Sequence, residues 1–110
     1  MVGRFWSFSV EPARAALVQE CLDSIALPAV RDQIGCQAVF ALREPAEPGR
    51  FAWLAFWVSR KAMDVSLASA EWSELREKMA GLGISLAESE ARSFETIATF
   101  FAGASPRSSD

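Results

Sequence analysis

Hydrophobic residues recur with two different periods along this chain, and the alternation of the two periods predicts its secondary structure. Trp6, Phe8 and Val10 are separated by smaller or polar residues, which is typical of a strand with one buried face. Segment 44–49 contains two prolines and a glycine and predicts a turn between two further strands. Strands are therefore expected at 4–10, 36–42, 51–58 and within 92–101, where Phe94, Thr96, Ala98 and Phe100 share a face.

The first stretch with helical spacing follows the first strand. Pro12 suits the first turn of a helix, where its missing N–H costs little. We expect this helix to end at about Leu27, because Pro28 disfavours the helical conformation in the residue before it. Its predicted apolar stripe is made of Val18, Leu22 and Ile25, widened by Ala15 and Cys21.

The second helical stretch runs from Arg60 to about Leu82, with a break expected near 66–69. Its buried stripe is predicted to consist of Trp72, Leu75, Met79 and Leu82. The element order is then β-α-β-β-α-β, the split βαβ pattern of an α+β ferredoxin-like domain.

The strand at 51–58 is apolar on both faces. Phe51, Trp53 and Trp57 occupy one face, and Leu54, Phe56 and Val58 occupy the other, because successive side chains of a strand point to opposite sides. The two helices of one chain can cover only one of these faces. We therefore predict that two copies pair sheet to sheet as a homodimer, in the manner of a dimeric α/β barrel.

Length and charge narrow the possible roles. The 110 residues fit one domain, expected over 1–102 and followed by a disordered tail at 103–110. The net charge is −3 with basic residues scattered along the chain, which disfavours a nucleic-acid binder. No apolar run reaches the roughly 18 residues of a membrane span, and no signal-peptide pattern opens the sequence, so we expect a cytoplasmic protein without membrane contact.

The residue types that are missing restrict the chemistry further. The sequence contains no His, no Tyr and no Asn. A Ser-His-Asp or Cys-His device and a histidine-based zinc or haem site cannot be built within one such chain. Cys36 is not expected to act as a nucleophile without an activating base, and neither a metal nor a cofactor is predicted.

Three short motifs resemble the dimeric α/β-barrel superfamily, and within it the antibiotic-biosynthesis-monooxygenase-type domains. They are Gly35-Cys36 before the second strand, Trp57-Val58-Ser59 after the third, and Ser69-Ala70-Glu71-Trp72 in the second helical stretch. The resemblance covers about residues 4 to 101. It implies the fold, the dimer and a ligand pocket, and it makes a cofactor-independent monooxygenase one possible activity.

The haem-degrading branch of that superfamily relies on an Asn on the first strand and on a Trp and a His on the second helix. By the same resemblance these positions fall here at about Trp6 or Ser7, near Ser66 and near Arg76. All three are replaced, so the chain is not expected to degrade haem.

Four tryptophans suggest an aromatic-lined ligand pocket, with Trp53 and Trp57 as its floor and Trp6 and Trp72 beside it. Arg76, one turn after Trp72, is a candidate for binding an anionic or phenolate oxygen. The alternative is that the tryptophans form the core or dimer interface and that Arg76 makes only local ion pairs on a solvated helix face.

Three functions remain open from the sequence. The first is a dimeric α/β-barrel protein that binds a small apolar or aromatic molecule. The second is a cofactor-independent monooxygenase, which would use the electron richness of its substrate to activate oxygen. The third is a non-catalytic structural or interaction module.

Overall fold

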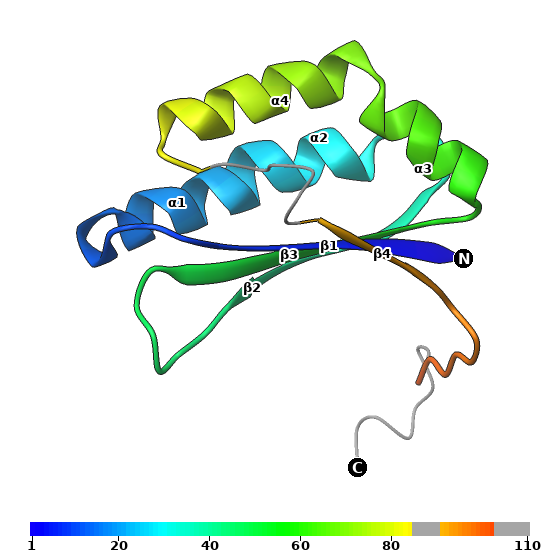
Figure 1. The fold of residues 1–110 in the computed structure, drawn as a ribbon, viewed down its shortest axis with the longest axis horizontal. Coiled ribbons are helices and arrows are strands. Elements are labelled where there is room, and N and C mark those ends of the chain that lie inside the picture. The colour runs from blue at the N-terminus through cyan, green and yellow to red at the C-terminus, as the bar shows by residue number, and fades with distance from the viewer. Residues whose placement is uncertain (85–90, 103–110) are drawn as a thin grey trace.

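The helices of the chain all lie on one face of an antiparallel sheet (Figure 1). The computed structural model describes residues 1–84 and 91–102. Within them the sheet has four strands in the order β2-β3-β1-β4. The strands are β1 (Val2–Ser9), β2 (Cys36–Arg43), β3 (Arg50–Trp57) and β4 (Arg92–Glu95). This order and the helices on one face confirm the predicted α+β ferredoxin-like fold.

The two central strands bring the predicted aromatic positions together. In the antiparallel register of β1 and β3, Trp6 pairs with Trp53 and Phe8 pairs with Phe51. All four side chains are buried on the helix-covered face. Strand β3 begins after a turn in which Gly49, at φ 93°, accepts a hydrogen bond from the Val10 N–H at 2.8 Å. A positive φ of this size favours glycine, which explains the residue at this position.

The first helical segment is longer than predicted, because Pro28 does not end it. A 3-10 turn at Pro12–Arg14 leads into α1 (Ala15–Cys21), then into a π-helical turn at Leu22–Ala26, and the path continues as α2 (Leu27–Arg31). A proline in a regular α-helix removes one hydrogen bond and presses its ring against the carbonyl four residues earlier. The wide turn directly before Pro28 offers that ring more room, and the helix continues past it.

The same wide turn changes which residues face the sheet. Ile25, predicted to lie in the apolar stripe, is 42% exposed, whereas Ala26 is 2% exposed. A π-helical turn holds one more residue than an α-helical turn, so successive buried residues on this side of the helix are four positions apart. The buried stripe consists of Val18, Leu22, Ala26 and Val30, and Cys21 widens it as predicted.

The second helical stretch is divided where the sequence indicated. Helix α3 spans Arg60–Leu67 and α4 spans Ala70–Gly81. The Ser59 hydroxyl accepts the Ala62 N–H at 3.1 Å, and the Ser69 hydroxyl accepts the Trp72 N–H at 3.2 Å. Both serines are thus N-caps. The spacing from Ser69 to Trp72, one of the motifs noted above, is therefore a helix-capping arrangement.

Strand β4 is shorter than predicted. Its last residue, Glu95, lies opposite Val2, where β1 itself begins. The next residue, Thr96, donates its N–H to the Met1 carbonyl at 2.9 Å. Within the described residues, no strand extends beyond Met1 with which residues after Thr96 could pair. Phe94 is in the strand, but the Thr96, Ala98 and Phe100 positions are not.

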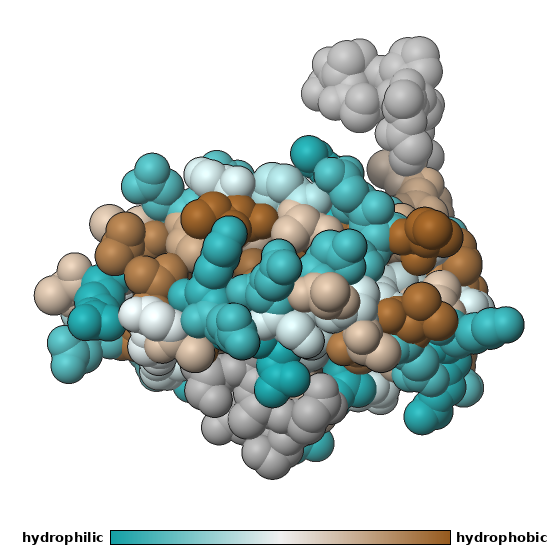
Figure 2. Space-filling view, turned by 90° about the horizontal axis from the view of Figure 1, so that it is seen from above, coloured by the Kyte–Doolittle hydropathy of each residue, from teal (hydrophilic) through white to brown (hydrophobic). Residues whose placement is uncertain are grey.

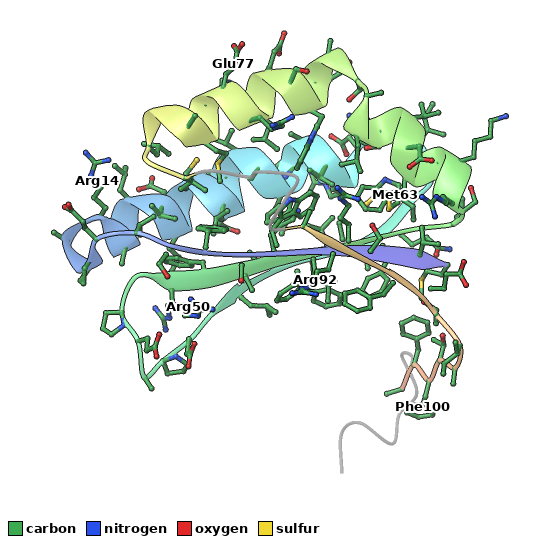
Figure 3. The ribbon with its side chains drawn as sticks, viewed as in Figure 1. Arg14, Arg50, Met63, Glu77, Arg92 and Phe100 are labelled. Carbon is green, nitrogen blue, oxygen red and sulfur yellow. The ribbon has the colours of Figure 1, made fainter. Side chains whose placement is uncertain are left out.

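The two faces of the sheet have different surroundings. The outer side of the helix layer is largely hydrophilic with scattered apolar residues (Figure 2), and Glu77 on α4 points away from the sheet (Figure 3). Among residues 1–84 and 91–102 no helix covers the opposite face, and the segment 96–102, with Phe100, lies on that side (Figures 1 and 3). We call this second surface the open face. Its apolar side chains, set by the strand register, are Phe5, Phe40, Leu42, Leu54, Phe56 and Phe94.

Side chains of the open face are only partly shielded within one chain. Phe40, Leu42 and Phe94 are 48%, 44% and 54% exposed, and Phe40 meets Phe56 edge-to-face with ring centroids 6.3 Å apart. Both faces of β3 are thus apolar, as predicted, and one of them is left without cover by the described residues of this chain.

Candidate functional site: a groove beside a tryptophan core

A groove of ≈ 840 Å³ runs between the first helical segment and the end of the sheet formed by β2 and β3. Its volume lies in the range of small-molecule sites, roughly 300–1,000 Å³. Helix α1 and the π-helical turn form one wall, and the last residues of β2 form the other. We call this site the helix–strand groove. Its apolar lining consists of Ala16, Leu22, Leu27, Ala41, Leu42 and Phe51.

Four polar side chains also line the groove. Gln19, Glu20 and Asp23 come from the helical wall, and Arg43 comes from β2. The Arg43 guanidinium donates to the Gln19 amide oxygen at 2.9 Å, a hydrogen bond that joins the helix to the strand. Arg43 is exposed and has further N–H donors, so it can also receive an oxygen atom of a bound molecule.

The four predicted pocket tryptophans are all part of the buried core between the sheet and the helices. Trp6, Trp53, Trp57 and Trp72 are 1%, 2%, 1% and 6% exposed. The rings of Trp6 and Trp72 are tilted by 34° with centroids 5.2 Å apart, which joins β1 to α4. Their burial agrees with the core alternative left open by the sequence, while a role in ligand binding stays a prediction.

Arg76 lies at the edge of the buried stripe of α4. It is exposed, one turn after Trp72 and one turn before Met79, and it lines none of the spaces described here. The arginine that does meet the tryptophan cluster is Arg4, whose guanidinium carbon lies 5.5 Å from the centroid of the Trp6 ring. Arg4 also donates to the Ser93 hydroxyl at 2.8 Å.

A second, much smaller space lies inside the tryptophan core. It leaves ≈ 10 Å³ for the centre of a water-sized molecule, about the minimum for one water. We call it the interior cavity. The side chains around it are all apolar or aromatic: Phe8, Leu22, Ala26, Trp53, Trp72, Leu75 and Met79.

The tryptophan core keeps unused hydrogen-bonding capacity. The indole N–H groups of Trp6, Trp53 and Trp57 are buried and have no acceptor among the described residues. A buried donor without a partner is costly, so native structures rarely keep several of them. One of the three, Trp53, lines the interior cavity.

Neither cysteine is prepared for nucleophilic chemistry. Burial raises the pKa of Cys21, against a smaller opposing effect of the Lys78 charge, and its thiol lies 3.6 Å from the Met79 sulfur. Burial also raises the pKa of Cys36, partly offset by a contact with the Ala38 carbonyl. A raised pKa lowers the thiolate fraction at neutral pH, and the thiolate is the reactive form. Over residues 1–84 and 91–102 no three His, Cys, Asp or Glu side chains form a metal-binding group, and no helix could span a membrane.

The sequence pointed to two apolar residues of the groove, Leu22 and Phe51, but only as buried positions of a helix and a strand. It singled out none of the polar residues of the groove, Gln19, Glu20, Asp23 and Arg43. The sequence feature that could have indicated the groove is Pro28 within a continuous helical pattern. A proline inside a helix indicates an irregular turn, and such turns are frequent at functional sites.

Comparison with known proteins supports the fold. The family model for antibiotic biosynthesis monooxygenase matches residues 1–78. A structure from Deinococcus radiodurans superposes with a TM-score of 0.76 at 22% identity, covering 92% of this chain and 97% of that one. Rv0793 from Mycobacterium tuberculosis gives 0.68 at 18% identity, covering 89% and 96%. A search of curated proteins found no match.

One similar structure has a stated activity. SnoaB from Streptomyces nogalater, described as a cofactor-independent oxygenase, superposes with a TM-score of 0.70 at 20% identity, covering 89% of this chain and 94% of that one. At this identity the superposition shows the shared fold. The family assignment rests on the sequence model, which matches well over half of the chain. The chain therefore belongs to the antibiotic biosynthesis monooxygenase family.

Proposed function

We propose that this protein binds a small, largely apolar aromatic molecule in the helix–strand groove. The observation that carries the proposal is the groove itself, which combines a ligand-sized volume of ≈ 840 Å³ with an apolar floor and a few polar side chains at its walls. Such a floor favours apolar rings, and a small number of polar groups fixes their orientation. Arg43 is the group we assign to an oxygen atom of the ligand.

The predicted tryptophans support the aromatic preference from behind the groove. Phe51 lines the groove, and Trp53 lies two residues along β3 on the same face. A ring bound against Phe51 would therefore lie close to the tryptophan cluster, and its arrival should change the tryptophan fluorescence. The role of Trp6, Trp53, Trp57 and Trp72 in this proposal is to support the floor rather than to contact the whole ligand.

Filling the groove with a side chain is expected to abolish binding. Ala16 is an exposed α1 residue that lines the groove, and Ala16→Trp should weaken binding of the neutral fluorescent probe N-phenyl-1-naphthylamine by about tenfold or more, because the indole would occupy its place. Titration by probe fluorescence measures the dissociation constant. Ala80→Trp, at an exposed position of α4 outside the groove, is the matched control and should bind like the unmodified protein. Equal weakening in both variants would contradict the proposal.

A second candidate is oxygenation of the bound molecule without a cofactor, and family membership favours it. We expect oxygen uptake with electron-rich polyphenols to depend on the protein and to persist in the presence of a chelator. An oxygen electrode measures it, and Ala16→Trp should reduce the rate if the reaction occurs in the groove. Binding of the polyphenol without oxygen uptake would leave binding alone as the function.

We further propose that the protein works as a homodimer in which the open faces of two copies meet. The open face holds six large apolar side chains, of which Phe40, Leu42 and Phe94 are about half exposed. Exposed apolar areas of this kind on a soluble domain usually mark an interface. The same patch can serve both partners across a two-fold axis. Ile97, Phe100 and Phe101, exposed at 97%, 78% and 74%, would find cover in the same assembly.

A further inference from the structure

We propose that Leu22 is the specificity-determining residue of the groove, setting how deeply an aromatic ligand can enter the molecule. The inference rests on the proposed binding of such a ligand in the helix–strand groove. Among the described residues, Leu22 is the one that lines both the groove and the interior cavity. Its side chain, 2% exposed, therefore stands between an open, ligand-sized space and an enclosed one.

The rest of the partition is aromatic and rigid. Phe51 lines the groove, Phe8 lines the interior cavity, and their rings stack with centroids 5.9 Å apart and planes at 21°. The two residues are also direct register partners in the sheet. Stacked rings on paired strands have little freedom to move apart. The aliphatic Leu22 on the opposite, helical wall is thus the adjustable part of the partition.

The position of Leu22 is fixed by the irregular turn that it begins. Its carbonyl accepts the Leu27 N–H, a hydrogen bond across five residues that defines the π-helical turn. Leu22 is buried as a regular helix would have it, and the wide turn that follows places Ala26, not Ile25, on the same buried side. The turn that accommodates Pro28 therefore begins at the residue that lies between the two spaces.

The chemical consequence is a limit on depth. With Leu22 in place, a ligand lies along the groove over Phe51, and the interior cavity has room for only about one water-sized molecule. With a shorter side chain at position 22, the two spaces join, and an aromatic ring can extend toward Trp53 and Trp72. The preferred ligand would then change from one that lies in the groove to a longer one that enters the core.

The test compares three equal truncations with N-phenyl-1-naphthylamine as the probe. Leu22→Ala joins the two spaces and should tighten binding about fivefold, as expected for some tens of Å² of added apolar contact. It should also shield the bound probe from quenching by iodide. Leu75→Ala is the matched control: Leu75 is 4% exposed and lines the interior cavity but not the groove, so affinity and iodide quenching should not change. Leu27→Ala, which alters only the groove, should weaken binding without added shielding.

Two milder variants keep the test decisive if Leu22→Ala fails to fold. Leu22→Val should show the same direction of change at smaller size, and Leu22→Met, of similar volume, should behave like the unmodified protein. Unchanged shielding in the folded Leu22→Ala and Leu22→Val variants, or equal effects of Leu22→Ala and Leu75→Ala, would overturn the role of Leu22 while leaving the groove proposal intact. No probe binding by any variant or by the unmodified protein would overturn both.

Discussion

Replacing Leu54 by aspartate is expected to dissociate the proposed dimer into monomers that unfold more readily. Leu54 lies at the centre of the open face, between its register partners Phe5 on β1 and Phe40 on β2. A carboxylate there would have to be buried without a partner when two open faces meet. We expect a loss of about 3 kcal/mol in association, which is more than a hundredfold in the dissociation constant. Light scattering at micromolar concentration measures the mass.

Two further substitutions separate dimerisation from folding. Phe40→Asp changes a side chain that is 48% exposed on an edge strand, so it should weaken the dimer with a smaller effect on the fold of one chain. Val65→Asp places the same charge at a 63% exposed position of α3, on the helix side of the sheet, and should leave the mass unchanged. A compact, stable monomer of the unmodified protein at micromolar concentration would be incompatible with the dimer.

Trp6→Ala is expected to cost about 3–5 kcal/mol of the free energy of unfolding. Trp6 is 1% exposed, sits in a central strand and has its ring 5.2 Å from that of Trp72. The loss is a large fraction of the total stability of a typical domain, about 5–15 kcal/mol, so the variant should unfold at a much lower urea concentration. Urea unfolding followed by circular dichroism, at one fixed protomer concentration, measures the change.

The size of the replacement side chain provides the comparison. Trp6→Phe keeps an aromatic ring and should cost clearly less than Trp6→Ala, because less of the cavity is left empty. Val65→Ala, at an exposed position, should change stability by no more than about 0.5 kcal/mol. If Trp6→Ala unfolded at the same urea concentration as Val65→Ala, the tryptophan cluster would not be the main stabilising element of the core.

The fold could be predicted where one local pattern determined one structural outcome. The alternation of Trp6 and Phe8 predicted a strand, the stripe of Trp72, Leu75 and Met79 predicted a helix, and both proved correct. The first helix was predicted less well, because a proline such as Pro28 is compatible with two structures. It can end a regular helix, as predicted, or it can follow a π-helical turn that accommodates its ring, as found here. Local sequence does not distinguish these outcomes, since packing of Leu22 and Ala26 against the sheet contributes to the choice.

The groove was harder to predict than the core, because it depends on which segments lie side by side. Gln19 and Arg43 are 24 residues apart in the sequence and become neighbours only when α1 packs beside the end of β2. Their residue types indicate nothing unusual on their own. The four tryptophans, by contrast, are large side chains that are usually well buried, and all four are buried here. This difference explains why the tryptophans were singled out as the site while the groove beside them was not.

The pairing of β1 with β4 has a consequence for how the chain folds as it is made. Val2 lies opposite Glu95, a contact between residues that are 93 positions apart in the chain. At about 5–20 residues per second, β4 leaves the ribosome roughly 5–20 s after β1. During this interval β1 can pair with β3 on one side, but the strand that pairs with its other edge, β4, has not yet been made. Contacts this distant in sequence also slow folding. The nascent chain therefore carries an unpaired strand edge beside an apolar sheet face, the combination that exposes a folding intermediate to aggregation.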